Sequence, residues 1–349
     1  MSVTHRPERT HGADRPPEAR RDRRAEAPPD RGWTPVLGVP LGITLLLAVL
    51  VSAFAWPAVN SAPRGVGLAI AAPAPAAEQV ESQLAAHAGA DAFDVTVVAD
   101  RAAAEDAVRN RDVYGALVLG PQGGEALVAS AASPAVAQIV TELASGIPAE
   151  AGGPLAVTDV VPLPDEDPRG LGLAAGLLPL VVGGIALGAA TALRVRGGVT
   201  ARLTALTGGA VLGGLTVVGL LQGWLGALGG SFWANAGVAA LLILAIAATV
   251  AGLGRLLGAG GIALGALLMV ALGNPLSGVT SAPEMLPSGW GTLGQWLPPG
   301  AGGTALRSVA YFDAAGSGTA WLVLSGWVLL GLVLLALPAS GRRSVATVA

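Results

Sequence analysis

Long apolar runs separated by short breaks fill most of this chain from Gly170 onward. An α-helix needs about 20 apolar residues to cross the ~30 Å hydrocarbon core of a bilayer. One more run of this kind extends from Val36 to Ala55. The composition agrees, since only 12% of the residues are charged, against about 25% in a typical soluble domain. We therefore predict a polytopic α-helical membrane protein with six transmembrane helices, at residues 35–57, 170–193, 203–225, 235–254, 256–273 and 318–339.

Residues 58–169, after the first span, have the periodicity of a folded soluble domain. Alternation of apolar and polar residues predicts strands, and apolar residues three and four apart predict helices. Ser133 followed by Pro134 is a typical helix start. The order β-α-β-α-β-β-α-β predicts an inserted external α/β domain. Its strands are expected at 65–72, 93–99, 113–120, 125–130 and 155–163, and its helices at 76–89, 101–110 and 133–146.

The basic residues, all of them arginine, predict the orientation of the spans. Cytoplasmic loops of membrane proteins carry an excess of basic residues. In an alternating six-span path every arginine cluster falls on one side, and the acidic domain 58–169 and the loop 274–317 fall on the other. We therefore expect a multi-pass protein of the plasma (inner) membrane with both termini cytoplasmic. The clusters are the tail 1–34, then Arg194, Arg196 and Arg202, then Arg255, then Arg342 and Arg343.

The N-terminal tail, residues 1–34, is rich in arginine, proline and acidic residues. Such a segment cannot bury a core, so we expect it to be disordered. Its eight arginines face six acids. This small excess favours an orientation signal over a role in nucleic-acid binding.

The residue types present exclude several classes of function. The phosphate-binding loop of ATPases requires a lysine, and this chain has none. No Asp, Glu, Arg or His lies deep inside a predicted span, which argues against a proton-coupled transporter with its own relay. Gln222, the most polar residue inside a span, is expected either to bond between helices or to lie at the interface next to Trp224, rather than to contact a substrate. His87 is expected to lie solvated on a helix. With no cysteine and no acid–base pair or metal-ligand set, we predict neither an enzyme nor a cofactor.

Glycines four residues apart recur in the predicted spans. In lipid, such small residues let two helices approach closely, so they indicate a packed bundle. The pairs are Gly184 and Gly188, Gly209 and Gly213, and Gly261 and Gly265.

The loop 274–317 is too broken to span a bilayer and too apolar for an ordinary solvated loop. Leu286, Trp290, Leu293 and Leu297 are spaced as one face of a short helix, which Pro298 and Pro299 would end. A second short helix is expected from Gly303 to Phe312. Two alternatives remain open for this hairpin: a lid or exit gate for a molecule leaving the bilayer, or an interfacial loop that only packs on the helix ends.

The layout resembles type-2 ABC exporter permeases and the related phage-infection-protein-like membrane proteins. The likeness rests on "RDVYGALVLGPQGGEALVASAASPAVAQIVTEL" (111–143) and "GNPLSGVTSAPEMLPSGWGTLGQWLPPGAGGTALRSVAYFD" (273–313), and it covers about residues 35–340. It implies a homo- or heterodimeric membrane subunit, driven by a separate ATP-binding subunit, that exports hydrophobic or amphipathic compounds. It also implies that the hairpin lines the exit of the translocation path. The candidate exit residues are Asn274, Pro275, Gly278, Trp290, Trp296, Pro298, Pro299, Gly300 and Arg307.

One feature departs from that family. Its second and third spans are usually joined by a charged helix that docks on the ATPase, whereas this chain has only "RVRGGVTAR". Arg194, Arg196 and Arg202 are the candidate coupling residues. The alternative function is a non-transporting cell-envelope protein whose acidic external domain binds a protein, a wall polymer or a phage.

Overall fold

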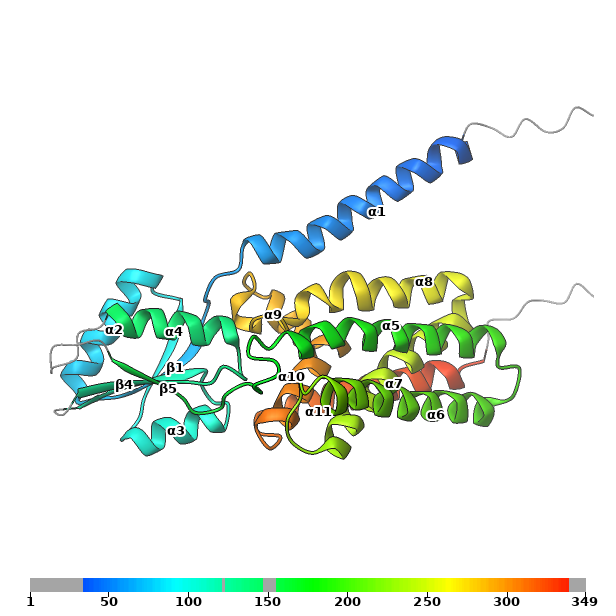
Figure 1. Cartoon of the computed structure of the whole chain (residues 1–349). Helices are drawn as coiled ribbons and strands as arrows, with labels where there is room; N and C mark the ends of the chain where they lie inside the picture. The colour runs from blue at the N-terminus through cyan, green and yellow to red at the C-terminus, as the bar shows by residue number, and fades with distance from the viewer. Residues whose placement is uncertain (1–33, 121–122, 147–154, 339–349) are drawn as a thin grey trace, which may run out of the picture. The chain divides into compact units, whose positions relative to one another are not determined.

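The computed structural model describes residues 34–120, 123–146 and 155–338 of the chain (Figure 1). The predicted tail up to residue 33 and the C-terminal arginines Arg342 and Arg343 lie outside the described residues. The chain divides into two units between Ala48 and Val49. The α/β domain, the 274–317 hairpin and the helices from α5 onward belong to the second unit.

A five-stranded sheet forms the centre of the α/β domain. Its strands lie in the order β2-β1-β3-β4-β5. Strand β1 pairs in parallel with β2 and β3, β3 pairs antiparallel with β4, and β4 pairs in parallel with β5. The strands are β1 Val66–Ala71, β2 Phe93–Val97, β3 Gly115–Gly120, β4 Gly123–Val128 and β5 Ala156–Asp159.

Three helices cover the two faces of this sheet, as Figure 1 shows. On one face Leu84 of α2 and Val140 of α4 are buried with Leu68 of β1. On the other face Val108 of α3 is buried with Ala69 of β1. Alternate residues of β1 thus enter different cores, as the pleat of a strand requires. The helices are α2 Ala74–Ala88, α3 Arg101–Arg109 and α4 Pro134–Gly146.

The predicted order of elements in this domain is confirmed. Ser133 is the predicted cap, and its Oγ accepts a hydrogen bond from the Val136 backbone N–H at 3.2 Å. His87 is exposed on α2, as expected. The last strand is shorter than predicted, because it ends at Asp159. There the Asp159 side chain turns back and accepts from the backbone N–H groups of Ser130 and Val161.

Five of the helices in the described part of the chain are long and apolar enough to cross a membrane. The protein is therefore a predominantly helical chain with the features of a multi-pass membrane protein. The segment expected to span at 256–273 is instead a shorter apolar stretch, Ala259–Gly273, so six full-length spans are not observed. The helices are α1 Thr34–Val59, α5 Leu171–Arg194, α6 Val199–Val218 extended by a π-helical turn η1 Gly219–Trp224, α7 Phe232–Leu257, and α11 Gly318–Ala336.

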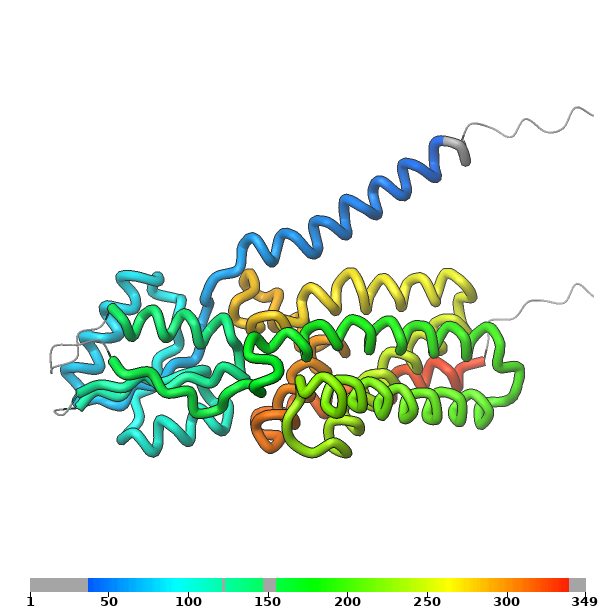
Figure 2. Tube along the Cα trace, in the orientation of Figure 1, coloured from blue at the N-terminus to red at the C-terminus, as the bar shows by residue number. Residues whose placement is uncertain are grey.

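Helix α7 is the central helix of the bundle, since 72% of the residues in its most apolar 18-residue stretch are buried. It packs against α5, α6, α11 and the short helix α8 Ala259–Leu267, which continues as the π-helical turn η2 Leu268–Gly273 (Figure 2). The predicted glycine pairs lie at several close contacts between helices of this bundle. A Cβ on Gly184 of α5 would lie 2.9 Å from the Ile246 side chain, and one on Gly265 of α8 would lie 3.0 Å from Val250. The remaining glycines of the pairs also face a neighbouring helix closely.

The 274–317 hairpin differs from its prediction in two respects. Pro298 and Pro299 do not only follow α9 Trp290–Gln295; they also begin α10 Pro298–Tyr311, earlier than the expected start at Gly303. Proline is well suited to the first helical position, where its missing N–H has no partner to lose. The remaining elements are two 3₁₀ turns, η3 Pro275–Ser277 and η4 Pro283–Met285.

The predicted apolar face of the first hairpin helix is also wrong. Leu286 and Leu297 are buried, but Leu293 is 54% exposed. The buried positions of α9 are its glycines, Gly291 and Gly294. These glycines face the backbone of Pro283 and Leu276 so closely that neither position has room for a Cβ. Helix α9 therefore packs through its backbone rather than through leucines.

Candidate functional site at the junction of the domain and the hairpin

The 274–317 hairpin completes both cores of the α/β domain. Ala282 and Met285 belong to the core under α2 and α4, and Phe312 belongs to the core under α3. Backbone bonds add to this contact, since the N–H of Arg64 donates to the Glu284 carbonyl at 3.0 Å. The domain is thus joined to the hairpin on both faces of its sheet.

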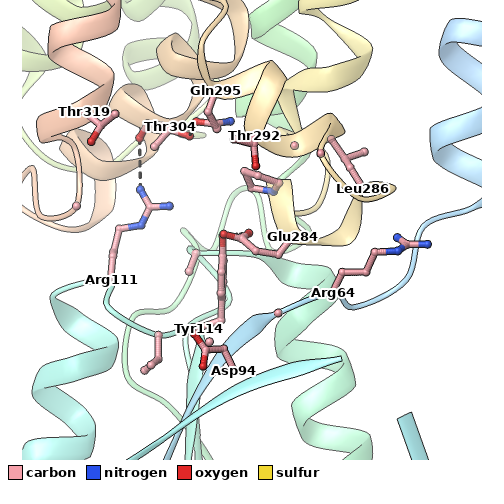
Figure 3. Close-up of a pocket in the computed structure, with 18 of the residues that line it drawn as sticks. Arg64, Asp94, Arg111, Tyr114, Glu284, Leu286, Thr292, Gln295, Thr304 and Thr319 are labelled. Carbon is pink, nitrogen blue, oxygen red and sulfur yellow. Dashed lines mark hydrogen bonds between the residues drawn. The ribbon is translucent and has the colours of Figure 1, made fainter. Parts of the chain in front are cut away.

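A cavity of about 620 Å³, here called the junction cavity, lies between the domain and the hairpin (Figure 3). Its walls come from the ends of β1 and β2, from the segment after α3, and from η4, α9, α10 and the start of α11. Both signs of charge are present. The charged residues that line it are Arg64, Asp94, Arg111, Asp112 and Glu284.

Arg111 reaches from the domain to α10. It directly follows the C-cap of α3 and has φ 61°, a left-handed conformation uncommon for arginine. Its Nη1 donates to the Ser308 hydroxyl and, at 3.4 Å, to the Thr304 carbonyl, as Figure 3 shows for Thr304. Its guanidinium also lies 5.3 Å from the centre of the Phe312 ring. Burial lowers the pKa of Arg111 below its usual value.

Tyr114 and Glu284 form a second link across the junction. The Tyr114 hydroxyl donates to the Glu284 carboxylate at 2.7 Å, and in Figure 3 the two side chains point toward each other. Burial, together with the charge and the hydrogen bond of Glu284, raises the pKa of Tyr114. The hydroxyl therefore keeps its proton and remains a donor at neutral pH.

Arg307 is buried inside α10 and is 6% exposed. Its Nη2 donates to the Val279 carbonyl at 2.6 Å, and none of the ion pairs found among the described residues includes it. Burial and then the neighbouring positive charge of Arg111 lower the pKa of Arg307 to about 10. The group is still protonated at neutral pH, so the positive charges of Arg111 from the domain and Arg307 from the hairpin lie close enough to interact.

Three predicted exit residues lie in a separate cavity of about 520 Å³. Asn274, Pro275 and Gly278 line it together with residues of α5 and of the C-terminal part of α1. Gly278 has φ +67°, and a Cβ there would lie 2.7 Å from the Pro283 nitrogen. Only glycine fits this position.

The other predicted exit residues do not gather at one point. Trp296 lines the junction cavity. Trp290 packs instead on Trp56, with ring centroids 4.6 Å apart. Pro298, Pro299 and Gly300 are buried at the start of α10, and neither they nor Arg307 line either cavity. Their predicted role in an exit path stays a prediction.

An apolar groove on α11, here called the α11 groove, adjoins the junction cavity. It has a volume of about 280 Å³ and shares two lining residues, Trp296 and Thr319, with that cavity. The Trp327 indole N–H donates to the Trp296 carbonyl at 2.8 Å and fixes the edge of the groove. The remaining lining residues are Leu322, Val323, Gly326 and Leu330.

The predicted coupling residues are on the connection from α5 to α6 or beside it. Arg194 and Arg196 are exposed, and the Arg202 Nε donates to the Val195 carbonyl at 3.4 Å. No helix intervenes between Arg194 and Val199. Gln222 bonds as expected, since its Oε1 accepts from the Asn235 side chain of α7 at 3.0 Å.

Apart from Trp296, the residues of the junction cavity discussed above were not predicted from the sequence as site residues. Arg111 opens one of the two quoted segments, and Glu284 is the one acid between Asn274 and Asp313. A lone acid in an apolar hairpin is a signal for a buried polar contact, but its partner Tyr114 is distant in sequence. Among the described residues no group of three or more His, Asp or Glu is placed to hold a metal.

Comparison with known proteins gave no match to this chain, whether with family models, curated proteins or solved structures.

Proposed function

We propose that this protein is the membrane subunit of an exporter of hydrophobic or amphipathic compounds, energised by a separate ATPase. The observation that carries the proposal is the junction cavity with the α11 groove beside it. Together they offer a polar and an apolar surface to one molecule at one end of the helical bundle. Ligand sites of this kind combine apolar walls with a few convergent polar groups.

The proposed path has six spans, with the shorter stretch Ala259–Gly273 as one of them. At about 1.5 Å per residue a helix of this length falls short of a bilayer, so it would need thinning or the cover of its neighbours. The Arg255 side chain donates to the carbonyl of Leu337, just after α11. This bond supports the placement of Arg255 and of the C-terminal end of α11 on the same side of the membrane. The proposed location is the plasma (inner) membrane, with both termini cytoplasmic and the α/β domain outside.

The hairpin is the proposed wall of the exit. Helix α10 is buried along nearly its whole length and packs against α5, α7 and α11. The domain holds α10 through Arg111, and it holds η4 of the same hairpin through Tyr114. A rearrangement of the bundle during transport would therefore move the wall of the junction cavity against the domain.

Orientation is tested by single-cysteine labelling, since the chain has no cysteine of its own. Ser145→Cys on α4 and Thr200→Cys at the start of α6 are both exposed. In intact cells a membrane-impermeant maleimide should label Cys at 145 and leave Cys at 200 unlabelled until the membrane is opened. The reverse pattern would overturn the orientation and the exporter proposal with it.

Function is tested by deletion and purification. We expect loss of the protein to lower efflux of amphipathic compounds, and affinity purification in mild detergent to recover an ATP-binding partner and a dimer. Unchanged efflux together with no ATPase partner would contradict the proposal.

The second candidate is a non-transporting envelope protein whose acidic domain binds a protein, a wall polymer or a phage. The short connection from α5 to α6 favours it, because no charged helix is present there to dock on an ATPase. Deletion should then leave efflux unchanged and remove binding of an envelope component or a phage to intact cells.

A further inference from the structure

We propose that the junction cavity and the α11 groove together bind one zwitterionic amphiphile that carries a phosphate, a primary amine and an acyl chain. The phosphate lies at Arg111, the amine at the carboxylates of the cavity, and the chain in the α11 groove. This inference names the substrate class of the proposed exporter and rests on that function for its role. The binding itself needs no ATPase.

The continuity of the two surfaces is the first argument. Trp296 and Thr319 line both the junction cavity and the α11 groove, so a single bound molecule can extend from the cavity into the groove. The rest of the groove is apolar, and Leu322 is 76% exposed at its edge. Trp296 and Trp327 lie where the polar junction cavity meets the apolar α11 groove. Aromatic residues take the same position at a membrane interface.

The charges of the cavity decide the head group. All hydrogen bonds found for Arg111 leave from Nη1, and its planar guanidinium has two further nitrogens suited to a phosphate. Glu284 accepts from Tyr114 through Oε2 alone. The Asp94 carboxylate, which also lines the cavity, accepts none of the side-chain hydrogen bonds found among the described residues. Arg64, the other lining arginine, already donates to the carbonyls of Asn60, Ala62 and Met285. A head group with one anionic and one cationic end matches Arg111 on one side and these carboxylates on the other.

The order of the groups along the cavity matches the order of groups in a phospholipid. In Figure 3, Arg111, Thr304 and Thr319 lie together on one side, while Glu284 and Asp94 lie further along the cavity. Thr319 is also the residue shared with the α11 groove. From the groove inward, the ligand therefore meets apolar residues first, then Arg111, and then the carboxylates.

A primary amine fits better than a quaternary one. Carboxylates accept hydrogen bonds that only an N–H group donates, whereas quaternary ammonium groups are held by cages of aromatic rings. Among the described residues, the aromatic side chains that line the cavity are those of Tyr114 and Trp296. The hydroxyl of Tyr114 is already bonded to Glu284.

The test measures binding of short-chain lipids to the purified full chain in detergent, by titration with native mass spectrometry. The probes are dihexanoyl phosphatidylethanolamine, phosphatidylcholine and phosphatidylglycerol. We expect the ethanolamine lipid to bind tightest. Glu284→Gln, whose amide oxygen can still accept from Tyr114, and Asp94→Asn should each lower its affinity about tenfold or less, as for a lost charge-assisted bond, and leave the glycerol lipid unchanged.

The acyl chain is tested with a matched pair of glycine variants. Gly326 lines the groove and Gly237 lies on α7 away from it, and a Cβ at either meets no atom within 4 Å. Gly326→Leu should lower the affinity for all three lipids about tenfold, because the leucine side chain fills the groove. Gly237→Leu should leave all three affinities unchanged.

Equal affinity for the three lipids, or an equal effect of both leucine variants, would overturn the site. Thermal unfolding of each variant shows whether it is folded, so a lost fold cannot be taken for lost binding. If the lipids bind as expected while deletion leaves efflux unchanged, the site stands and the exporter proposal fails. If efflux falls on deletion but no lipid binds, the exporter proposal stands and the site fails.

Discussion

Two groups of charged side chains lie on the same α/β domain, and they differ in their contact with water. Arg101 joins Glu105 at 2.8 Å and Glu125 at 2.6 Å, on a surface where its side chain is 47% exposed. Arg111 and Arg307 are instead held by carbonyl and hydroxyl oxygens at the junction with the hairpin. The first group consists of exposed ion pairs, whereas none of the ion pairs found among the described residues includes Arg111 or Arg307.

The comparison shows why ion pairs are a poor guide to the important contacts of this protein. An exposed pair gains little, because water screens it and the side chains lose freedom. A buried cation whose partners are removed costs far more, since its charge stays out of water. Substitutions at the buried arginines of the junction should therefore lower the stability of the protein more than substitutions at the exposed ion pairs.

The largest effect is expected from reversing a charge in each group. Arg307→Glu places a carboxylate against the Val279 carbonyl and should lower the free energy of unfolding by about 3 kcal/mol or more. Arg109→Glu, at the exposed pair with Glu105, should have a much smaller effect. Thermal unfolding in one detergent measures both. Equal shifts of the midpoint would mean that the junction is not held as described.

A smaller effect is expected from the link between Tyr114 and Glu284. In a double-mutant cycle of Tyr114→Phe and Glu284→Ala, the coupling energy should be about 1–2 kcal/mol at pH 7. The same cycle on Arg101 and Glu125 serves as the exposed control and should give less. A coupling that is absent at the junction and present at the surface would reverse the comparison.

The pH dependence of that link has a definite sign. The pKa of Tyr114 is raised in the folded protein by burial and by Glu284, so its contribution is fully present below the unfolded pKa of about 10. It is lost as pH rises above that value, because the unfolded state then releases a proton that the folded state keeps. The stability difference between the natural chain and Tyr114→Phe should thus fall above about pH 10. A difference independent of pH up to 11.5 contradicts this assignment.

The smallest effect is expected from salt on the exposed group. The arginines lower the pKa values of Glu105 and Glu125 through hydrogen bonds, but the pairs face solvent. Arg101→Ala should destabilise the chain slightly at low ionic strength and not measurably in 1 M salt, where the Debye length is about 3 Å. The effect of Tyr114→Phe at pH 7 should persist in the same salt. Unfolding at both salt concentrations separates the two cases.

Local sequence patterns were enough to predict the elements of the α/β domain and most of the long helices. Ser133 caps α4 because a serine Oγ before a helix can accept a hydrogen bond from a first-turn backbone N–H that has no partner within the helix, here that of Val136. The failures came where the chain packs through its backbone. Gly291 and Gly294 replaced the expected leucines as the buried face of α9, because close approach of two backbones leaves no side-chain periodicity to read.

The candidate site illustrates the same limit. Trp296 was among the residues predicted from the sequence, and it lines both the junction cavity and the α11 groove. Arg111 and Tyr114 were not, because their partners Ser308 and Glu284 lie 197 and 170 residues further along the chain. No spacing rule joins residues so far apart.

The long apolar helices and the glycines at which helices meet could be predicted from the sequence, because apolar runs and small-residue spacing are local properties. The entry of the hairpin into both cores of the α/β domain could not be predicted in this way, nor could the gathering of two arginines, a tyrosine and a glutamate at that junction. Those contacts depend on burial away from water, and burial is a property of the folded chain rather than of any one segment.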